Sequence, residues 1–141
     1  MQIANIGIPT CMTTLGYPQG YDVYQYDPCQ GSANQTFDFL NTSTAYYYQI
    51  QSQASNNEGC IDNYGNTGNN DAVQVFEPCV GAGNEIYLAY SAGISGEPNE
   101  AYLIDSQGLC LTSSGNANDP VEQYTCYNGD NNQIWNIVPY P

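Results

Sequence analysis

The sequence predicts an all-β fold of three similar repeats that close into a barrel with pseudo-threefold symmetry. Three observations support this prediction. Cysteine pairs recur at a nearly constant interval, short segments alternate as strands do, and no stretch is amphipathic over the length of a stable helix. Closure into a barrel is favoured because it removes exposed strand edges.

The cysteines set the repeat. The pairs are Cys11 and Cys29, Cys60 and Cys79, and Cys110 and Cys126. The first members are separated by 49 and 50 residues, and the second members follow them after 18, 19 and 16 residues. Six cysteines permit many pairings, but if each repeat is one structural unit, each most simply closes its own disulfide: Cys11–Cys29, Cys60–Cys79 and Cys110–Cys126. Disulfides indicate an oxidising compartment.

Other sequence features recur at the same interval as the cysteines. An aromatic residue precedes each second cysteine, and an asparagine follows it after a glycine-rich turn. Segments 23–26, 73–76 and 121–124 alternate as strands do, as do 46–51 and 101–104. With turns between strands, each repeat holds roughly four of them. We therefore expect one domain over residues 1–141, with repeats of about 1–50, 51–100 and 101–141.

The composition excludes several classes of function. Lys, Arg and His are absent, and fourteen Asp and Glu residues give a formal net charge of −14. Nucleic-acid binding needs cations to neutralise phosphates, so no nucleic-acid partner is expected. Anionic membrane surfaces would repel the chain. We also expect no cofactor and no metal. The segment 66–71 is rich in Asn and Asp, but it lacks the EF-hand spacing of a calcium loop and is better interpreted as a solvated turn.

No targeting or membrane segment is evident. The first residues, MQIANIGIPTCM, contain no positive region and no long apolar run, and no segment approaches the roughly 20 apolar residues of a membrane span. We expect a secreted protein without membrane insertion, seen as a mature sequence or with Met1 added by cloning. A cytosolic protein with free thiols is the alternative.

The repeated pattern resembles that of ricin B-type (R-type) lectins, which have a β-trefoil fold. The three copies are CMT…YDPCQGSANQTF, CIDN…FEPCVGAGNEIY and CLTS…YTCYNGDNNQIW. The first copy has Phe37 where the family has Trp, and the second has Glu85 for Gln and Tyr87 for Trp. The third copy fits best, with Gln133 and Trp135. We expect Phe37, Tyr87 and Trp135 to fill the core.

The resemblance implies a lectin for galactose-type sugars, with at most one shallow pocket per repeat. Carried over to the middle repeat, the pocket consists of Asp62, Gln74, Phe76 and Asn84. A carboxylate accepts charge-assisted hydrogen bonds from sugar hydroxyls, the amides donate and accept, and the aromatic face contacts the C–H face of the ring. The alternative interpretation of Asp62 is a simple turn residue.

The other two repeats lack the aspartate, so we expect weak or lost sites there. The first repeat offers Thr13, Tyr26 and Asn34, and the third offers Thr112, Tyr124 and Asn132. In both repeats the asparagine is interpreted more simply as a turn residue.

The main prediction is therefore a non-enzymatic lectin that binds glycans. It is either a free protein, as a monomer or an oligomer, or a module fused to an enzyme domain. A second hypothesis is a secreted structural or protein-interaction β-trefoil, such as a matrix component or protease inhibitor, with degenerate sugar sites. The absence of tryptic sites motivates it. A glycosidase acting through two carboxylates ranks lowest, because no recognisable pair is present.

Overall fold

A computed structural model describes residues 1–14, 21–55, 58–63, 68–81 and 83–139. These residues form twelve strands and four 3₁₀ helices of one turn each, with no α-helix among them. The strands are β1 (Gln2–Asn5), β2 (Cys11–Thr14), β3 (Tyr21–Tyr26), β4 (Phe37–Asn41), β5 (Tyr47–Ser52), β6 (Gly59–Asp62), β7 (Gln74–Phe76), β8 (Ile86–Ser91), β9 (Glu100–Ile104), β10 (Leu109–Thr112), β11 (Glu122–Thr125) and β12 (Trp135–Val138). The helices are η1 (Ala33–Gln35), η2 (Gln53–Ser55), η3 (Gly83–Glu85) and η4 (Asn131–Gln133). The predicted all-β class is confirmed.

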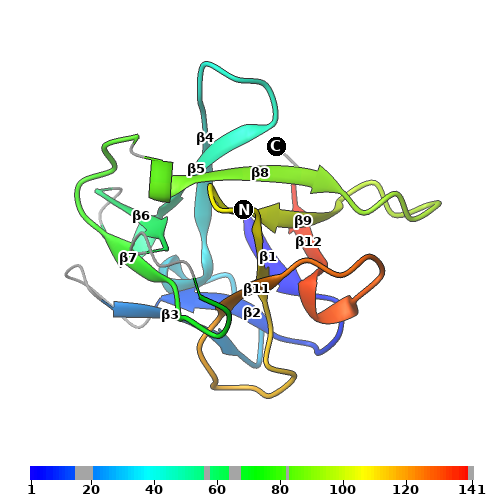
Figure 1. Cartoon of the computed structure of the whole chain (residues 1–141). Helices are drawn as coiled ribbons and strands as arrows, with labels where there is room; N and C mark the ends of the chain where they lie inside the picture. The colour runs from blue at the N-terminus through cyan, green and yellow to red at the C-terminus, as the bar shows by residue number, and fades with distance from the viewer. Residues whose placement is uncertain (15–20, 56–57, 64–67, 82, 140–141) are drawn as a thin grey trace.

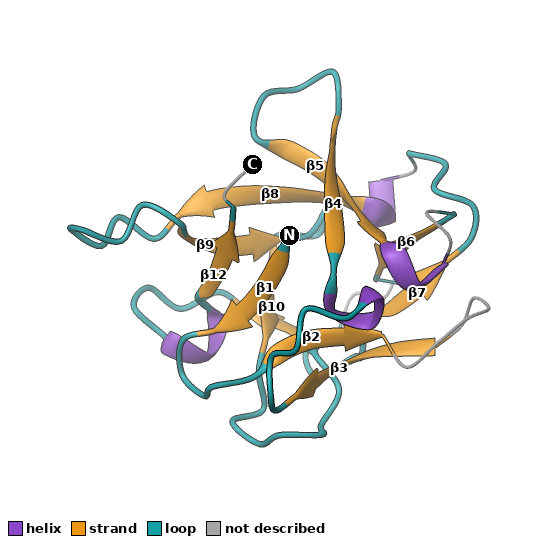
Figure 2. Cartoon of the chain, turned by 180° about the vertical axis from the view of Figure 1, so that it is seen from behind, coloured by secondary structure: helices purple, strands orange, loops and turns teal. Residues whose placement is uncertain are grey.

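Six of the strands form a closed barrel (Figure 1). Antiparallel pairing runs from β4 through β5, β8, β9 and β12 to β1. The ring is completed where the Phe37 N–H donates to the Met1 carbonyl over 2.8 Å. Seen from behind, the hairpin loop between β8 and β9 extends away from the body of the molecule (Figure 2). The closed barrel with three four-strand repeats is the β-trefoil that the resemblance implied.

The remaining six strands form three hairpins, β2–β3, β6–β7 and β10–β11. A cyclic set of backbone hydrogen bonds joins them. The Val23 N–H donates to the Val73 carbonyl, the Val73 N–H to that of Val121, and the Val121 N–H to that of Val23, over 3.0, 3.1 and 2.7 Å. All three valines are fully buried. The hairpins therefore meet around the pseudo-threefold axis, each contributing one donor and one acceptor.

Each hairpin carries the disulfide of its own repeat, as the sequence predicted. The pairs are Cys11–Cys29, Cys60–Cys79 and Cys110–Cys126, with Cα–Cα distances of 5.3, 5.2 and 5.2 Å. In each, the first cysteine lies in the first strand of the hairpin and the second lies just beyond the second strand. The disulfide thus fixes the chain where it leaves the hairpin toward the 3₁₀ turn.

The core lies inside the barrel. Phe37, Tyr87 and Trp135 are its largest fully buried side chains, as expected for the three equivalent aromatic positions. The Trp135 indole N–H donates to the Leu111 carbonyl over 2.9 Å, so its polar atom is satisfied. Aliphatic residues from every repeat complete the same cluster.

The disulfides should carry a large share of the stability. Replacing Cys60 and Cys79 together by Ala should lower the free energy of unfolding by roughly 3 kcal/mol, the chain-entropy value for loops of this size. Urea unfolding of the variant and the wild type measures the difference. An unchanged midpoint would contradict the prediction, and the same double substitution at Cys110 and Cys126 tests whether the repeats contribute equally.

Candidate functional site

The middle repeat places its predicted residues on one face of the β6–β7 hairpin. Asp62 ends β6 and is the register partner of Gln74, the first residue of β7. Side chains of paired residues lie on the same side of a sheet. Both side chains are almost completely buried, Asp62 with 3 % exposed. Phe76 lies two residues further along the same face and is 38 % exposed.

Asn84 completes the middle site from η3. Its side-chain amide donates to the Asp62 carboxylate over 2.8 Å, and its carbonyl accepts from the Asn63 N–H over 3.0 Å. The structure therefore brings Asp62 and Asn84 into direct contact, with Gln74 beside them and the Phe76 ring at the exposed end. A carboxylate oriented by an amide, next to an open aromatic face, can bind vicinal hydroxyls of a sugar.

The first repeat forms a hollow of about 230 Å³. All three predicted residues line it, together with three that were not predicted as site residues: Thr13, Tyr26 and Asn34, with Gln30, Ser32 and Gln35. The Thr13 hydroxyl donates to the Cys11 carbonyl over 3.0 Å. Its hydrogen is therefore used within the protein, which leaves only acceptor capacity for a ligand.

The third repeat shows the same use of its threonine. The Thr112 hydroxyl donates to the Cys110 carbonyl over 2.8 Å. Asn132 lies in η4, where its N–H is capped by the Asp130 carboxylate over 2.9 Å, and its carbonyl accepts from the Ser113 N–H. The Tyr124 ring lies 6.1 Å from that of Tyr127. The backbone of Asn132 therefore forms part of the η4 turn.

Behind the first and third sites lies a buried glutamine whose side chain makes the same three hydrogen bonds. The side-chain oxygens of Gln35 and Gln133 accept from the N–H groups of Gln30 and Tyr127, over 2.5 and 2.7 Å. Their amide nitrogens donate to a backbone carbonyl and to the threonine hydroxyl, Thr13 over 3.2 Å and Thr112 over 3.1 Å. Each glutamine therefore fixes the threonine of its site, Thr13 or Thr112, through a hydrogen bond from the buried side.

The middle repeat has Glu85 in this position. Its Oε2 atom accepts from the N–H groups of Val80 and Gly81 over 2.8 and 3.1 Å, and from the Gln49 amide over 3.1 Å. Gly81 has a φ of 70°, a conformation that glycine adopts without strain, and this turn directs both N–H groups inward. The Oε1 atom is buried and has no hydrogen-bond partner among the described residues. By analogy with Gln35 and Gln133, Oε1 occupies the position of the side-chain amide nitrogen, which donates hydrogen bonds in those two residues.

The environment of Glu85 favours its protonated form. Burial raises the pKa of the Glu85 carboxyl above the ordinary value of 4.5, and the charge of Asp62 adds to the rise, while the hydrogen bonds from Val80, Gly81 and Gln49 oppose it. Since the folded pKa exceeds the unfolded one, the contribution to stability is full below about pH 4.5 and is lost as the pH rises through the folded pKa. The stability of the protein therefore depends on pH through the protonation of Glu85 beside the middle site.

Sequence reasoning found Glu85 only as a departure from the family pattern. The signal was present, because an acid replaces an amide in the same repeat as Asp62, in a chain without Lys, Arg or His. No sequence feature indicated Gln49, because its contact with Glu85 depends on the pairing of β5 with β8.

Among the described residues, no three potential metal ligands form a cluster. Residues 66 and 67 of the predicted solvated turn lie outside the described residues. In the described part of the chain, no helix has the length and apolar character to cross a membrane.

The model of the ricin-type beta-trefoil lectin domain matches residues 1–135. The chain belongs to this family. Its domains bind carbohydrate and are not themselves enzymes. A comparison with curated protein sequences gives no match.

Solved structures agree on the fold. The designed threefold-symmetric protein ThreeFoil is 19 % identical with a TM-score of 0.78, over 95 % of this chain and 94 % of that one. The Polyporus squamosus lectin, bound to a human-type influenza-binding epitope, is 15 % identical with a TM-score of 0.74, over 95 % and 46 %. The Haemophilus ducreyi cytolethal distending toxin is 13 % identical with a TM-score of 0.76, over 99 % and 83 %. The chain spans under half of the Polyporus lectin, and identities this low show the fold alone.

Replacing Glu85 by Gln should stabilise the protein at neutral pH. We expect the free energy of unfolding to rise by about 1–3 kcal/mol, the usual cost of an unsatisfied buried polar atom, because the new amide can donate as Gln35 and Gln133 do. Urea unfolding at acidic and neutral pH should also show that the gain over wild type shrinks toward acidic pH.

The matched control is Gln133→Glu, which introduces the same carboxyl into the third repeat. It should destabilise the protein at neutral pH, and less so at acidic pH. If Glu85→Gln were no more stable than wild type at neutral pH, the analogy between Glu85 and the two glutamines would be wrong.

Proposed function

We propose that this protein is a secreted lectin for galactose-type sugars and that the middle repeat is its main site. The observation that carries the proposal is the hydrogen bond from Asn84 to the buried carboxylate of Asp62, beside Gln74 and the exposed ring of Phe76. Asp62 accepts hydrogen bonds from two vicinal hydroxyls of the sugar. Asn84 and Gln74 donate and accept hydrogen bonds that select the orientation of these hydroxyls, and Phe76 packs against the C–H face of the ring.

The first and third repeats bind more weakly in this proposal. Each offers a threonine hydroxyl in place of Asp62, and both hydroxyl hydrogens already bond to cysteine carbonyls. A neutral oxygen forms weaker hydrogen bonds than a carboxylate. The hollow of the first repeat, with Tyr26 42 % exposed, makes it the better of the two.

The wider context is also proposed. We interpret the chain as one domain with three repeats, acting extracellularly, since disulfides are typical of oxidising compartments. One main site gives low affinity, so useful avidity would need oligomers or a fused partner domain. The second candidate is a protein-interaction trefoil, which the replacement of Asp62 by a threonine in the first and third repeats favours.

Titration with lactose, followed by amide NMR, tests the proposal. We expect shifts that cluster on Asp62, Gln74, Phe76 and Asn84, and a loss of binding of at least about tenfold in Asp62→Ala, because the charge-assisted acceptor is removed. The spectrum of the free variant shows whether it remains folded.

The matched variant is Thr112→Ala, at the equivalent position of the third repeat. It should leave the middle-site affinity unchanged. Lactose shifts that persist in Asp62→Ala, or no shifts up to tens of millimolar, roughly tenfold beyond weak specific binding, would refute the middle-site proposal and favour the interaction protein.

A further inference from the structure

The outer face of β8 and β9 carries aromatic side chains outside the barrel core, of which Tyr102 packs in a smaller cluster with Cys110 and Ile134. Along β8, Tyr87 and Ala89 point into the barrel, while Leu88 and Tyr90 point outward. The register pairs Leu88 with Ile104 and Tyr90 with Tyr102, so the outward residues of the two strands lie side by side. This gives an apolar and aromatic surface across two repeats.

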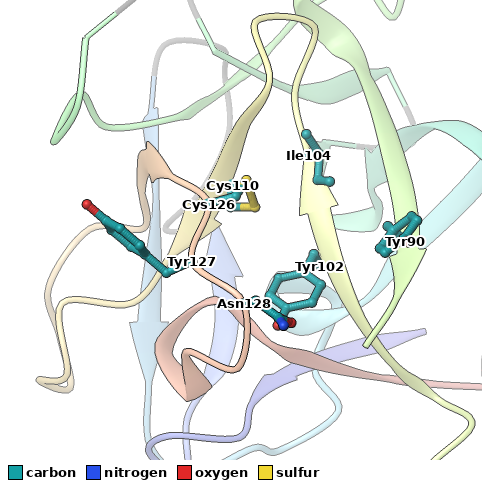
Figure 3. Close-up of a pocket in the computed structure, with 7 residues that line it drawn as sticks. All are labelled: Tyr90, Tyr102, Ile104, Cys110, Cys126, Tyr127 and Asn128. Carbon is teal, nitrogen blue, oxygen red and sulfur yellow. A yellow bond between two sulfur atoms is a disulfide. The ribbon is translucent and has the colours of Figure 1, made fainter. Parts of the chain in front are cut away.

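Two hollows lie on this surface. The first, of about 410 Å³, is shown in Figure 3, where Tyr90 and Tyr102 project from neighbouring strands near the Cys110–Cys126 disulfide. The second, of about 400 Å³, lies on the other side of Tyr90, between Tyr46 and Pro98. We call the two together the tyrosine face. Each has the size of an ordinary ligand pocket, and none of the ten predicted sugar-binding residues lines either one.

The chemistry of the tyrosine face suits a sugar chain. Tyr90 is 58 % exposed and Tyr127 is 53 % exposed, so both rings can contact the C–H face of a pyranose. Tyr102 is only 7 % exposed, and its hydroxyl accepts from the Gly129 N–H over 2.7 Å, which holds it as a fixed floor. The Asn128 amide and the Ser91 hydroxyl supply polar contacts at the edge.

The charge around this face selects the kind of sugar. Alternation along β9 places Glu100 on the same outward side as Tyr102. Glu97 lies in the β8–β9 hairpin next to Pro98. Burial raises the pKa of the Glu100 carboxyl, and the neighbouring charge of Glu97 raises it further. No Lys, Arg or His exists in the chain to balance these two carboxylates.

Other occupants fit less well. A second copy of the chain would bring another net charge of −14 against the first, and an acidic or sulfated ligand would meet the same repulsion. A ligand with protonated amines would instead gain attraction from Glu97 and Glu100 and a cation–π contact with the tyrosines.

We propose that the tyrosine face is a second carbohydrate site, which binds a chain of amino sugars with free, protonated amines. The sugar rings lie across Tyr90 and Tyr102, and the amines face Glu97 and Glu100. The choice of a sugar rests on the carbohydrate-binding function of the domain, but the site is independent of the galactoside pocket at Asp62.

Calorimetric titration with a glucosamine oligomer tests the proposal, with the N-acetylglucosamine oligomer of equal length as the uncharged control. At mildly acidic pH, where the amines are protonated, the free-amine oligomer should bind at least about tenfold more tightly. Added salt should weaken its binding, because it screens exposed charges. Equal affinity for the two oligomers would overturn the charge argument.

Variants locate the site. Tyr90→Ala and Tyr127→Ala should each weaken binding by about threefold to tenfold, the range of an exposed cation–π contact and its lost packing. Glu100→Gln should weaken it as well, whereas Asp27→Asn, which removes the same charge from an exposed position in the first repeat, should have little effect. Equal losses in Glu100→Gln and Asp27→Asn would show general polyelectrolyte attraction and refute a defined site.

Two further arms separate the alternatives. Asp62→Ala should keep its affinity for the glucosamine oligomer, so that failure of the galactoside proposal and failure of this one are distinguishable. Oligolysine should bind more weakly than the glucosamine oligomer. If oligolysine bound as tightly, and Tyr90→Ala weakened both, the face would be a dock for basic polypeptides and the amino-sugar proposal would be wrong.

Discussion

The cyclic hydrogen bonds among Val23, Val73 and Val121 set the geometry on which the rest of the structure depends. Each valine donates to one hairpin and accepts from another, so none of the three hairpins can shift register alone. A slip by one residue would turn every side chain of a strand to the other face. The pairing of Asp62 with Gln74 is set within the β6–β7 hairpin, and the valine bonds fix the position of that hairpin relative to the other two.

Within that frame, a chain without cationic side chains must satisfy its carboxylates with neutral donors. Asn84 donates to Asp62, Gln49 to Glu85, and the backbone N–H groups of Gln107 and Leu109 to Asp105. The bonds to Asp62 and Asp105 reach carboxylate acceptors, and charge-assisted hydrogen bonds are stronger than neutral ones. The abundance of Asn and Gln is therefore a structural counterpart of the missing Lys and Arg, as well as a feature of a sugar-binding surface.

The sequence predicted the features that repeat and missed those that arise between repeats. The spacing of the cysteines was enough for the three disulfides, because each links residues of one hairpin. The alternation at 23–26, 73–76 and 121–124 matched β3, β7 and β11. The contact of Gln49 with Glu85 and the tyrosine face were not foreseen, since both depend on the pairing of β8 with β5 and β9. Such pairings have no local sequence signature.

The pairing of β1 with β12 has a consequence for biosynthesis. Within this domain, β1 has no partner on that side until β12 has been translated, so the barrel can close only after all the described strands have been made. Contacts between such distant residues form slowly, because a long loop must be ordered first. During that interval the hairpin disulfides close only short loops. Oxidation within each repeat can therefore precede assembly of the whole, and the chain can enter its final ring with three hairpins already cross-linked.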